Sequence, residues 1–223
     1  MAQDIYRHAD KSLMVIFNDM AKRFQKFGST LGFDELNVLE TRKAVNAMYR
    51  AIDALVQREY RKIALAAYRE AGGPDDDFDP YEFVYAMLHA YDPLSDFVYS
   101  REYTRKRDRL FEAIIATQTG NQEMRKVLKR NLDVLANQVR QYADNTTIRA
   151  RIQAFKDAGV RYVRWVTEDD EKVCSVCNPR HNVIYKIEEL PALPAHWRCR
   201  CHIEIVTEEE YLAQQAAKRS ETT

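Results

Sequence analysis

The chain has 223 residues, and its 34 basic and 34 acidic side chains give a formal net charge of zero. This balance argues against a protein that coats nucleic acid over its whole surface, and it leaves room only for a local basic patch. A chain of this length can bury a real core in one or two domains, so its four cysteines are not needed for global stability.

The opening stretch, "MAQDIYRHADKSLMVIF", carries charges throughout and lacks an apolar run with a cleavage site. No stretch approaches ~18 apolar residues, so we expect neither a secretory signal nor a membrane span. We therefore expect a soluble protein, intracellular at synthesis, in a reducing compartment where clustered cysteines are more often metal ligands than disulfides.

Helical periodicity prevails up to residue 158. We expect Asp34 to cap the second helix and Gly159 to end the last one. The second helix exceeds the usual globular length, which favours an extended shape or packing against a partner. The predicted helices cover about residues 9–27, 34–70, 80–90, 100–117, 121–143 and 146–158.

Beyond Gly159 the hydrophobic period changes. In "VRYVRWVT" (160–167), Tyr162 and Arg164 alternate with Val163 and Trp165, as in a half-buried strand. Two more short strands are expected at 182–187 and 201–206, followed by a weak helix with a polar end. The sequence thus predicts a mainly α fold with an extended helical part (1–145), a small α+β C-terminal module (146–207) and a tail (208–223).

All four cysteines lie close together in the C-terminal module, as Cys174-x2-Cys177 and Cys199-x-Cys201, with His196 three residues before Cys199. A C-x2-C turn directs two thiolates at one point, and a second pair from a distant loop completes a tetrahedron around Zn²⁺. We favour Cys174, Cys177, His196 and Cys199 as ligands of one structural zinc per chain. Cys201 either replaces His196 or is a buried thiol, because strand alternation opposes turning Cys199 and Cys201 the same way.

Other interpretations of the cluster are buried cysteines without a metal, disulfides, and a catalytic zinc. His202 to Glu204 forms an H-x-E sequence, but in zinc deaminases that sequence precedes the C-x-x-C, whereas here it follows. His181 and His202 are left out of the ligand set, since a lone histidine is more often a satisfied surface or core residue. The charges of Asp170, Arg198 and Arg200 either surround a structural site or belong to a solvated loop.

The stretch from Tyr162 to Cys201 joins a Trp-x-Thr strand end, C-x2-C, a short strand and P-x-H-x2-C-R-C. This combination resembles the C-terminal domain of the phage Mu F-like minor head proteins, the head-morphogenesis family of tailed phages, over about residues 146–206. Where that family often has glycine after the second cysteine, Asn182 can adopt the left-handed turn. The positions that match are Trp165, Thr167, Asp170, Cys174, Cys177, Pro194, His196, Cys199, Arg200 and Cys201.

The resemblance implies a minor capsid protein with no catalytic activity that acts in head morphogenesis. Its expected partners are the portal and other head or scaffold proteins, in an oligomeric assembly near packaged DNA. Its expected location is the virion, in the head interior or at the portal vertex, after assembly in the host cytoplasm. The alternatives are a cytosolic zinc-knuckle protein that binds nucleic acid and, from a third class, a zinc enzyme.

A local excess of basic residues lies between residues 101 and 130. It suits non-specific contact with DNA phosphates or an acidic portal or scaffold surface, or it is a solvated helix face with i, i+4 partners. The 13 tyrosines also have two possible roles, as anchors of an interface or as packing in the helical core. The candidate contact residues are Arg105, Lys106, Arg107, Arg109, Arg125, Lys126, Lys129 and Arg130.

Overall fold

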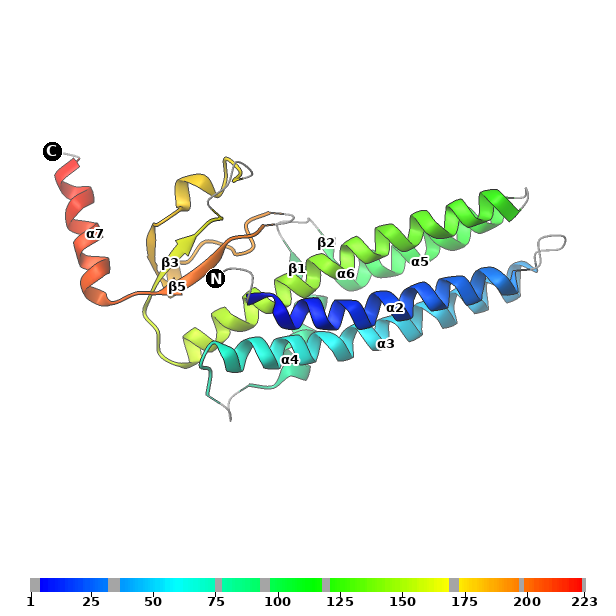
Figure 1. The fold of residues 1–223 in the computed structure, drawn as a ribbon, viewed down its shortest axis with the longest axis horizontal. Helices are drawn as coiled ribbons and strands as arrows, with labels where there is room; N and C mark the ends of the chain where they lie inside the picture. Colours follow the sequence, from blue (N-terminus) through cyan, green and yellow to red (C-terminus); the bar gives the residue numbers. More distant parts are fainter. Residues whose placement is uncertain are drawn as a thin grey trace.

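Long helices form an elongated bundle that carries a small sheet at one end (Figure 1). The computed structural model describes residues 5–31, 37–74, 78–92, 97–117, 121–168, 173–196 and 199–221. A hairpin of β1 (Tyr91–Asp92) and β2 (Phe97–Val98) leads into the fourth helix of the bundle. The helices of the bundle are α2 (Arg7–Thr30), α3 (Val38–Glu70), α4 (Pro80–His89), α5 (Tyr99–Ala116) and α6 (Asn121–Asp157).

Side-chain caps fix where two of these helices start. The side chain of Asn37 accepts a hydrogen bond from the backbone N–H of Glu40 at 3.1 Å, so α3 begins at Val38. The predicted cap, Asp34, lies outside the described residues. Asp79 caps α4 in the same manner, ahead of a proline in its first turn.

Residues 121–157 form one continuous helix, so the prediction of two helices, at 121–143 and 146–158, was wrong. The polar run at 144–147 suggests a break, yet the side chains of Asn145, Thr146 and Thr147 bond within the helix. The hydroxyls of Thr146 and Thr147 donate to carbonyls four residues back, at 2.6 and 3.1 Å, and Gln141 bonds to Asn145. Gly159, with φ of 71°, follows the end of α6 as predicted.

The core of the bundle joins α2, α3, α4, α5 and α6 through apolar and aromatic side chains. Two buried phenols reach across it: Tyr60 donates to the carbonyl of Val139 at 2.7 Å, and Tyr103 donates to that of Tyr49 at 2.8 Å. Core packing is therefore the role of many of the tyrosines. The buried tyrosines of the bundle are Tyr49, Tyr60, Tyr68, Tyr99, Tyr103 and Tyr142.

The C-terminal module contains a three-stranded antiparallel sheet in the order β4-β3-β5. Its strands are β3 (Tyr162–Val166), β4 (Ile184–Lys186) and β5 (His202–Ile205), which confirms the three predicted strands. Val163 and Trp165 are fully buried while their neighbours in β3 are half-buried, as the alternation predicts. The described part of the chain is thus mainly helical, with the short β1–β2 hairpin and one three-stranded sheet, and the division into domains stays a prediction.

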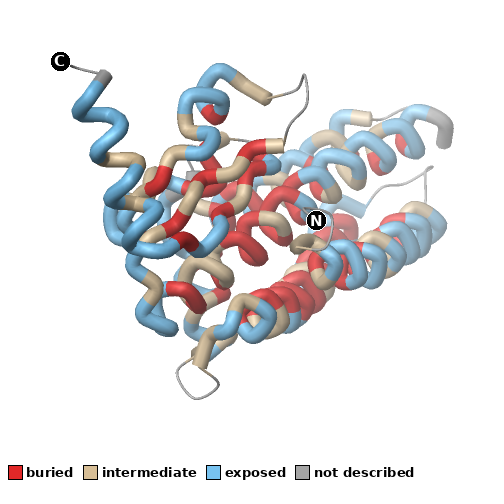
Figure 2. Tube along the Cα trace, turned by 60° about the vertical axis from the view of Figure 1, so that its left-hand side comes forward, coloured by how far each residue is buried: buried red, intermediate tan, exposed pale blue. Residues whose placement is uncertain are grey.

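Helix α7 (Glu208–Glu221) lies against the edge of β4 and is mostly exposed (Figure 2). The side-chain amide of Gln214 accepts from the N–H of Ile184 at 2.9 Å and donates to the carbonyl of Asn182 at 2.8 Å. This amide occupies backbone groups that an edge strand otherwise presents to solvent.

A second core lies between the sheet and the end of α6. Trp165 and Ile203 of the sheet meet Ile148 and Phe155 of α6, and Tyr6 packs against both this core and that of the bundle. The sheet is therefore attached to the bundle through α6 and the start of α2. Among the described helices, none is both long enough and apolar enough to span a membrane.

Candidate metal centre

The first two cysteines lie in a tight turn between β3 and β4. The backbone N–H of Cys177 points at the sulfur of Cys174 at 3.3 Å, and the N–H of Asn178 bonds to the carbonyl of Cys174 at 2.9 Å. This turn places both side chains on one side, as the two-residue spacing predicts.

The second group of donors comes from the segment that precedes β5. The N–H of Cys199 bonds to the carbonyl of His196 at 3.2 Å, so the two residues are brought together by a turn of the same span as the first. Residues 199–201 are not part of the strand, which starts at His202. The objection that strand alternation separates Cys199 from Cys201 was therefore wrong.

All five predicted donors converge at one place. The Nε2 atom of His196 lies 3.0 Å from the sulfur of Cys174 and 3.2 Å from that of Cys177, and the sulfur of Cys177 lies 3.9 Å from that of Cys199. The donor atoms form two triads, Cys174–Cys177–His196 and Cys177–Cys199–Cys201, each within 4.8 Å. Cys177 belongs to both triads and is the hub of the cluster. Such a donor set suits a tetrahedral, thiolate-rich zinc site.

Burial and mutual hydrogen bonding set the proton affinity of these thiols. A hydrogen bond from Cys201, with other contacts, lowers the pKa of Cys199 to about 5. The same hydrogen bond, together with burial, raises the pKa of Cys201, and burial raises that of Cys177. Burial opposes ionisation of Cys174 too, but hydrogen bonds from Cys177 outweigh it and lower its pKa. A divalent cation stabilises all the thiolates at once, so metal binding is coupled to proton release.

The surroundings of the cluster leave space for one small species. A cavity of about 30 Å³ is lined by Cys174, Cys177, Cys201 and His196 together with residues of the adjoining loops. This space is enough for a water molecule or an ion. Trp165 packs beneath the cluster as a fully buried ring of the second core.

The other histidines lie outside both triads. The Nδ1 atom of His181 faces the hydroxyl and the backbone N–H of Thr167, at 2.9 and 3.2 Å. His202 is mostly buried, with Nε2 3.8 Å from an oxygen of Glu204, and burial lowers its pKa. Arg200 lines the cavity. Asp170 and Arg198, the other predicted neighbours of the cluster, lie outside the described residues.

The predicted basic patch is spread over α5 and α6, and much of its charge is balanced locally. Arg105 and Lys106 both pair with Glu102, and Arg107 pairs with Asp108. On α6, acidic residues one turn away pair with two more of the lysines. These pairs favour the interpretation of a solvated helix face. Exposed basic residues of the patch for which no ion pair was found among the described residues are Arg109, Arg125 and Arg130.

Asn182 adopts the left-handed backbone conformation expected of it from the sequence. Its φ is 61°, in the left-handed region that glycine adopts most easily. Its N–H bonds to the carbonyl of Trp165 at 2.8 Å, which ties the loop to β3.

Residues 107–204 match a family model described as Phage Mu protein F like protein. The match begins in α5, well before the segment of about 146–206 that the sequence pattern indicates, and includes all five metal donors. No curated protein and no solved structure shows significant similarity to the chain. Over residues 107–204, the chain is thus similar to the Phage Mu protein F-like family.

Proposed function

We propose that this protein is a minor head protein of a tailed phage whose C-terminal module is held together by one structural zinc. The match of residues 107–204 to the Phage Mu protein F-like family supports a role in head morphogenesis, as a structural component. The single observation that carries the metal proposal is the convergence of five Cys and His donors, from two chain segments, within the matched region.

The proposed ligands are Cys174, Cys177, His196 and Cys199, with Cys201 as the fifth donor of the cluster. When bound, zinc supplies bonds between the turn at 174–177 and the segment at 196–201. The chain itself supplies the orientation: backbone hydrogen bonds shape the first turn, and the buried ring of Trp165 supports the cluster from the sheet. Because both segments lie next to strands, linking them fixes the order of the sheet.

The bundle is the part we propose to dock on the portal or inner head. It is elongated (Figure 1), and exposed residues lie along α3 and along residues 123–140 of α6. Contact with packaged DNA, if it forms, is non-specific and involves Arg109, Arg125 and Arg130, the exposed basic residues for which no ion pair was found in the described part of the chain.

The test is zinc content per chain in purified protein, followed by thermal melting with and without a strong chelator. We expect one zinc per chain and a melting transition of the module that collapses on chelation, because binding energy of a structural zinc is folding energy. Metal-free protein with four titratable thiols and an unchanged melt contradicts the zinc proposal. Recovery of the protein from purified particles at a fixed ratio to the portal tests the head role separately.

The second candidate is a zinc-knuckle protein that binds nucleic acid through residues 101–130. Its support is the residual positive charge of Arg109, Arg125 and Arg130, and the ion pairs nearby argue against it. Strong binding to any duplex by free protein, with an affinity that falls steeply with salt, favours this candidate over the first.

A further inference from the structure

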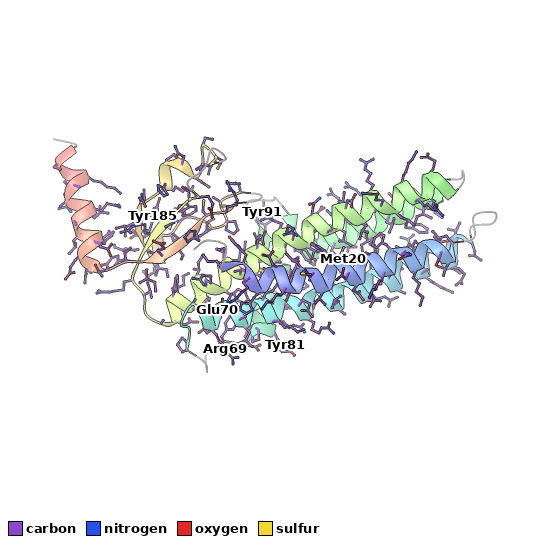
Figure 3. All side chains as sticks on the ribbon, in the orientation of Figure 1. Met20, Arg69, Glu70, Tyr81, Tyr91 and Tyr185 are labelled. Atoms are coloured by element: carbon purple, nitrogen blue, oxygen red, sulfur yellow. The ribbon has the colours of Figure 1, made fainter. Side chains whose placement is uncertain are left out.

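One outward face of α4 combines bulky rings with small side chains. Tyr81 and Tyr85 are 63% and 64% exposed, although α4 also buries three apolar residues against the bundle. Figure 3 shows Tyr81 at the outer edge of the bundle. Six exposed residues make up this surface, which we call the α4 face: Tyr81, Glu82, Tyr85, Ala86, His89 and Ala90.

The rings of the α4 face are held in place before any partner arrives. The guanidinium of Arg61, from α3, lies 4.2 Å from the ring centroid of Tyr81. The ring of His89 stacks on that of Tyr85 with centroids 4.1 Å apart, and its Nδ1 lies 2.8 Å from the carbonyl of Tyr85, to which it donates. Ordered side chains lose less entropy on binding, and tyrosine and arginine are enriched at protein interfaces.

The α4 face has two parallel rows of side chains, and one row is complementary in size to the other row of a second, antiparallel copy. The row Tyr81, Tyr85 and His89 is bulky, and the parallel row Glu82, Ala86 and Ala90 carries two methyl groups. A two-fold axis between positions 85 and 86 sets Tyr85 against Ala86 of a second copy and Tyr81 against Ala90. The same axis sets the carboxylate of Glu82 against the imidazole of His89. Each tyrosine then faces an alanine, and the acid faces the only histidine of the helix.

We propose that the α4 face binds the same face of a second copy of this chain, with the two α4 helices antiparallel about a two-fold axis. Rows spaced four residues apart interdigitate when the helices cross at about −50°, which brings the centres of the two helices into contact. A two-fold contact of this kind is closed, because each copy uses the same patch. The proposal rests on the described surface of α4 and not on the metal centre.

The contact area is limited by the length of α4, which has 10 residues. Interfaces at the low end of the size range are weak, so we expect a dissociation constant of roughly 10–100 µM for the free dimer. In a larger assembly, additional contacts raise the effective concentration and make such a weak pair significant.

The test is sedimentation equilibrium of the full chain, loaded with zinc and kept reduced, from about 5 to 500 µM. We expect a monomer–dimer equilibrium that Ala86→Arg weakens at least tenfold, because the arginine occupies the space of the facing tyrosine. Ala86 is exposed, so the variant keeps its helix content and melting temperature. The matched control is Ala21→Arg, on the exposed side of α2, which leaves the equilibrium unchanged.

Charge reversal tests the register. Glu82→Lys sets a lysine against His89, and His89→Glu sets a glutamate against Glu82, so each single variant weakens the dimer. The double variant pairs lysine with glutamate and restores the dissociation constant to within about threefold of the wild type. A parallel contact sets 82 against 82 and is not rescued in this way. A wild-type chain that stays monomeric, a dimer insensitive to Ala86→Arg, or failure of the double variant to recover each overturns the proposal.

Discussion

The helical bundle and the C-terminal module are stabilised by different means. The bundle buries a continuous core along helices of up to 37 residues, with tyrosines whose hydroxyls bond across it. The module has strands of three to five residues, a small core, and a cluster of five metal donors beside it. A small sheet with few apolar contacts gains little from burial, so cross-linking through a metal has its greatest effect there.

Both tryptophans of the chain, Trp165 and Trp197, belong to the module by their position in the sequence, while the helices dominate the far-ultraviolet circular dichroism. Tryptophan emission therefore reports on the module and circular dichroism on the bundle. The two regions can be followed separately in one sample, which makes the comparison between them testable.

The largest expected effect is that of Cys177→Ser, because Cys177 belongs to both donor triads. We expect zinc affinity to fall by on the order of 10³-fold or more, with loss of the folding energy that the metal supplies. Trp165, fully buried in the native module, then becomes solvated and its emission shifts to longer wavelength. Helical circular dichroism at 25 °C stays near the wild-type value.

The matched control is Cys201→Ser, which removes a donor of only one triad. If His196 is the fourth ligand, this variant keeps one zinc per chain and native tryptophan emission. Loss of zinc from Cys201→Ser, with retention in His196→Ala, assigns the site to four cysteines instead. Retention of zinc by Cys177→Ser contradicts its place as the hub.

An intermediate effect is expected from Ile52→Ala, in the bundle. Ile52 is fully buried on α3, so the cavity it leaves costs about 2–5 kcal/mol of the free energy of unfolding. Denaturant unfolding followed by circular dichroism measures this loss, while the zinc content stays at the wild-type level. Leu39→Ala, at a position 62% exposed on the same helix, changes stability by no more than about 0.5 kcal/mol. Equal losses in both variants contradict the assignment of the core.

Periodicity alone predicted most of the architecture, because buried faces impose a spacing on the sequence. Leu13, Ile16 and Met20 recur at helical spacing and are buried, and Val163 and Trp165 alternate with half-buried residues in β3. The cysteine spacing predicted for a similar reason that the thiols cluster, since a C-x2-C turn has one compact geometry, while metal binding stays a prediction. These features depend on neighbours in the chain.

What the sequence did not predict depends on contacts distant in the chain. The polar run at 144–147 reads as a helix break, but Thr146 and Thr147 are buried, and the hydroxyl of Thr146 lies 3.4 Å from the sulfur of Met87 in α4. That Cys199 and Cys201 share a site depends on where β5 starts. Tyr6 gives no sequence signal for its position between the two cores.

The smallest effect, and the one that tests the junction of the two regions, concerns Asp144 on α6. Burial, only partly opposed by Arg140, raises the pKa of Asp144 from 3.8 to about 7. The folded state then holds a proton that the unfolded chain releases near pH 4. The contribution of protonated Asp144 to the free energy of unfolding is therefore fully present below about pH 4. It falls as the pH rises from about 4 to 7 and is lost above that.

Asp144→Asn removes the charge at nearly constant shape. We expect the variant to match the wild type at pH 4 and to exceed it at pH 8 by about 2 kcal/mol, less than the full shift implies because the carboxylate is partly solvated. Urea unfolding at both pH values measures the difference, with Asp133→Asn, an exposed acid on the same helix, as the control. Because Asp144 raises the pKa of Tyr6, which packs against both cores, the gain at pH 8 should appear in tryptophan emission as well as in circular dichroism. A gain seen by circular dichroism alone means that the two regions unfold independently. Equal stability of variant and wild type at pH 8 means that the carboxylate of Asp144 is solvated in the folded state.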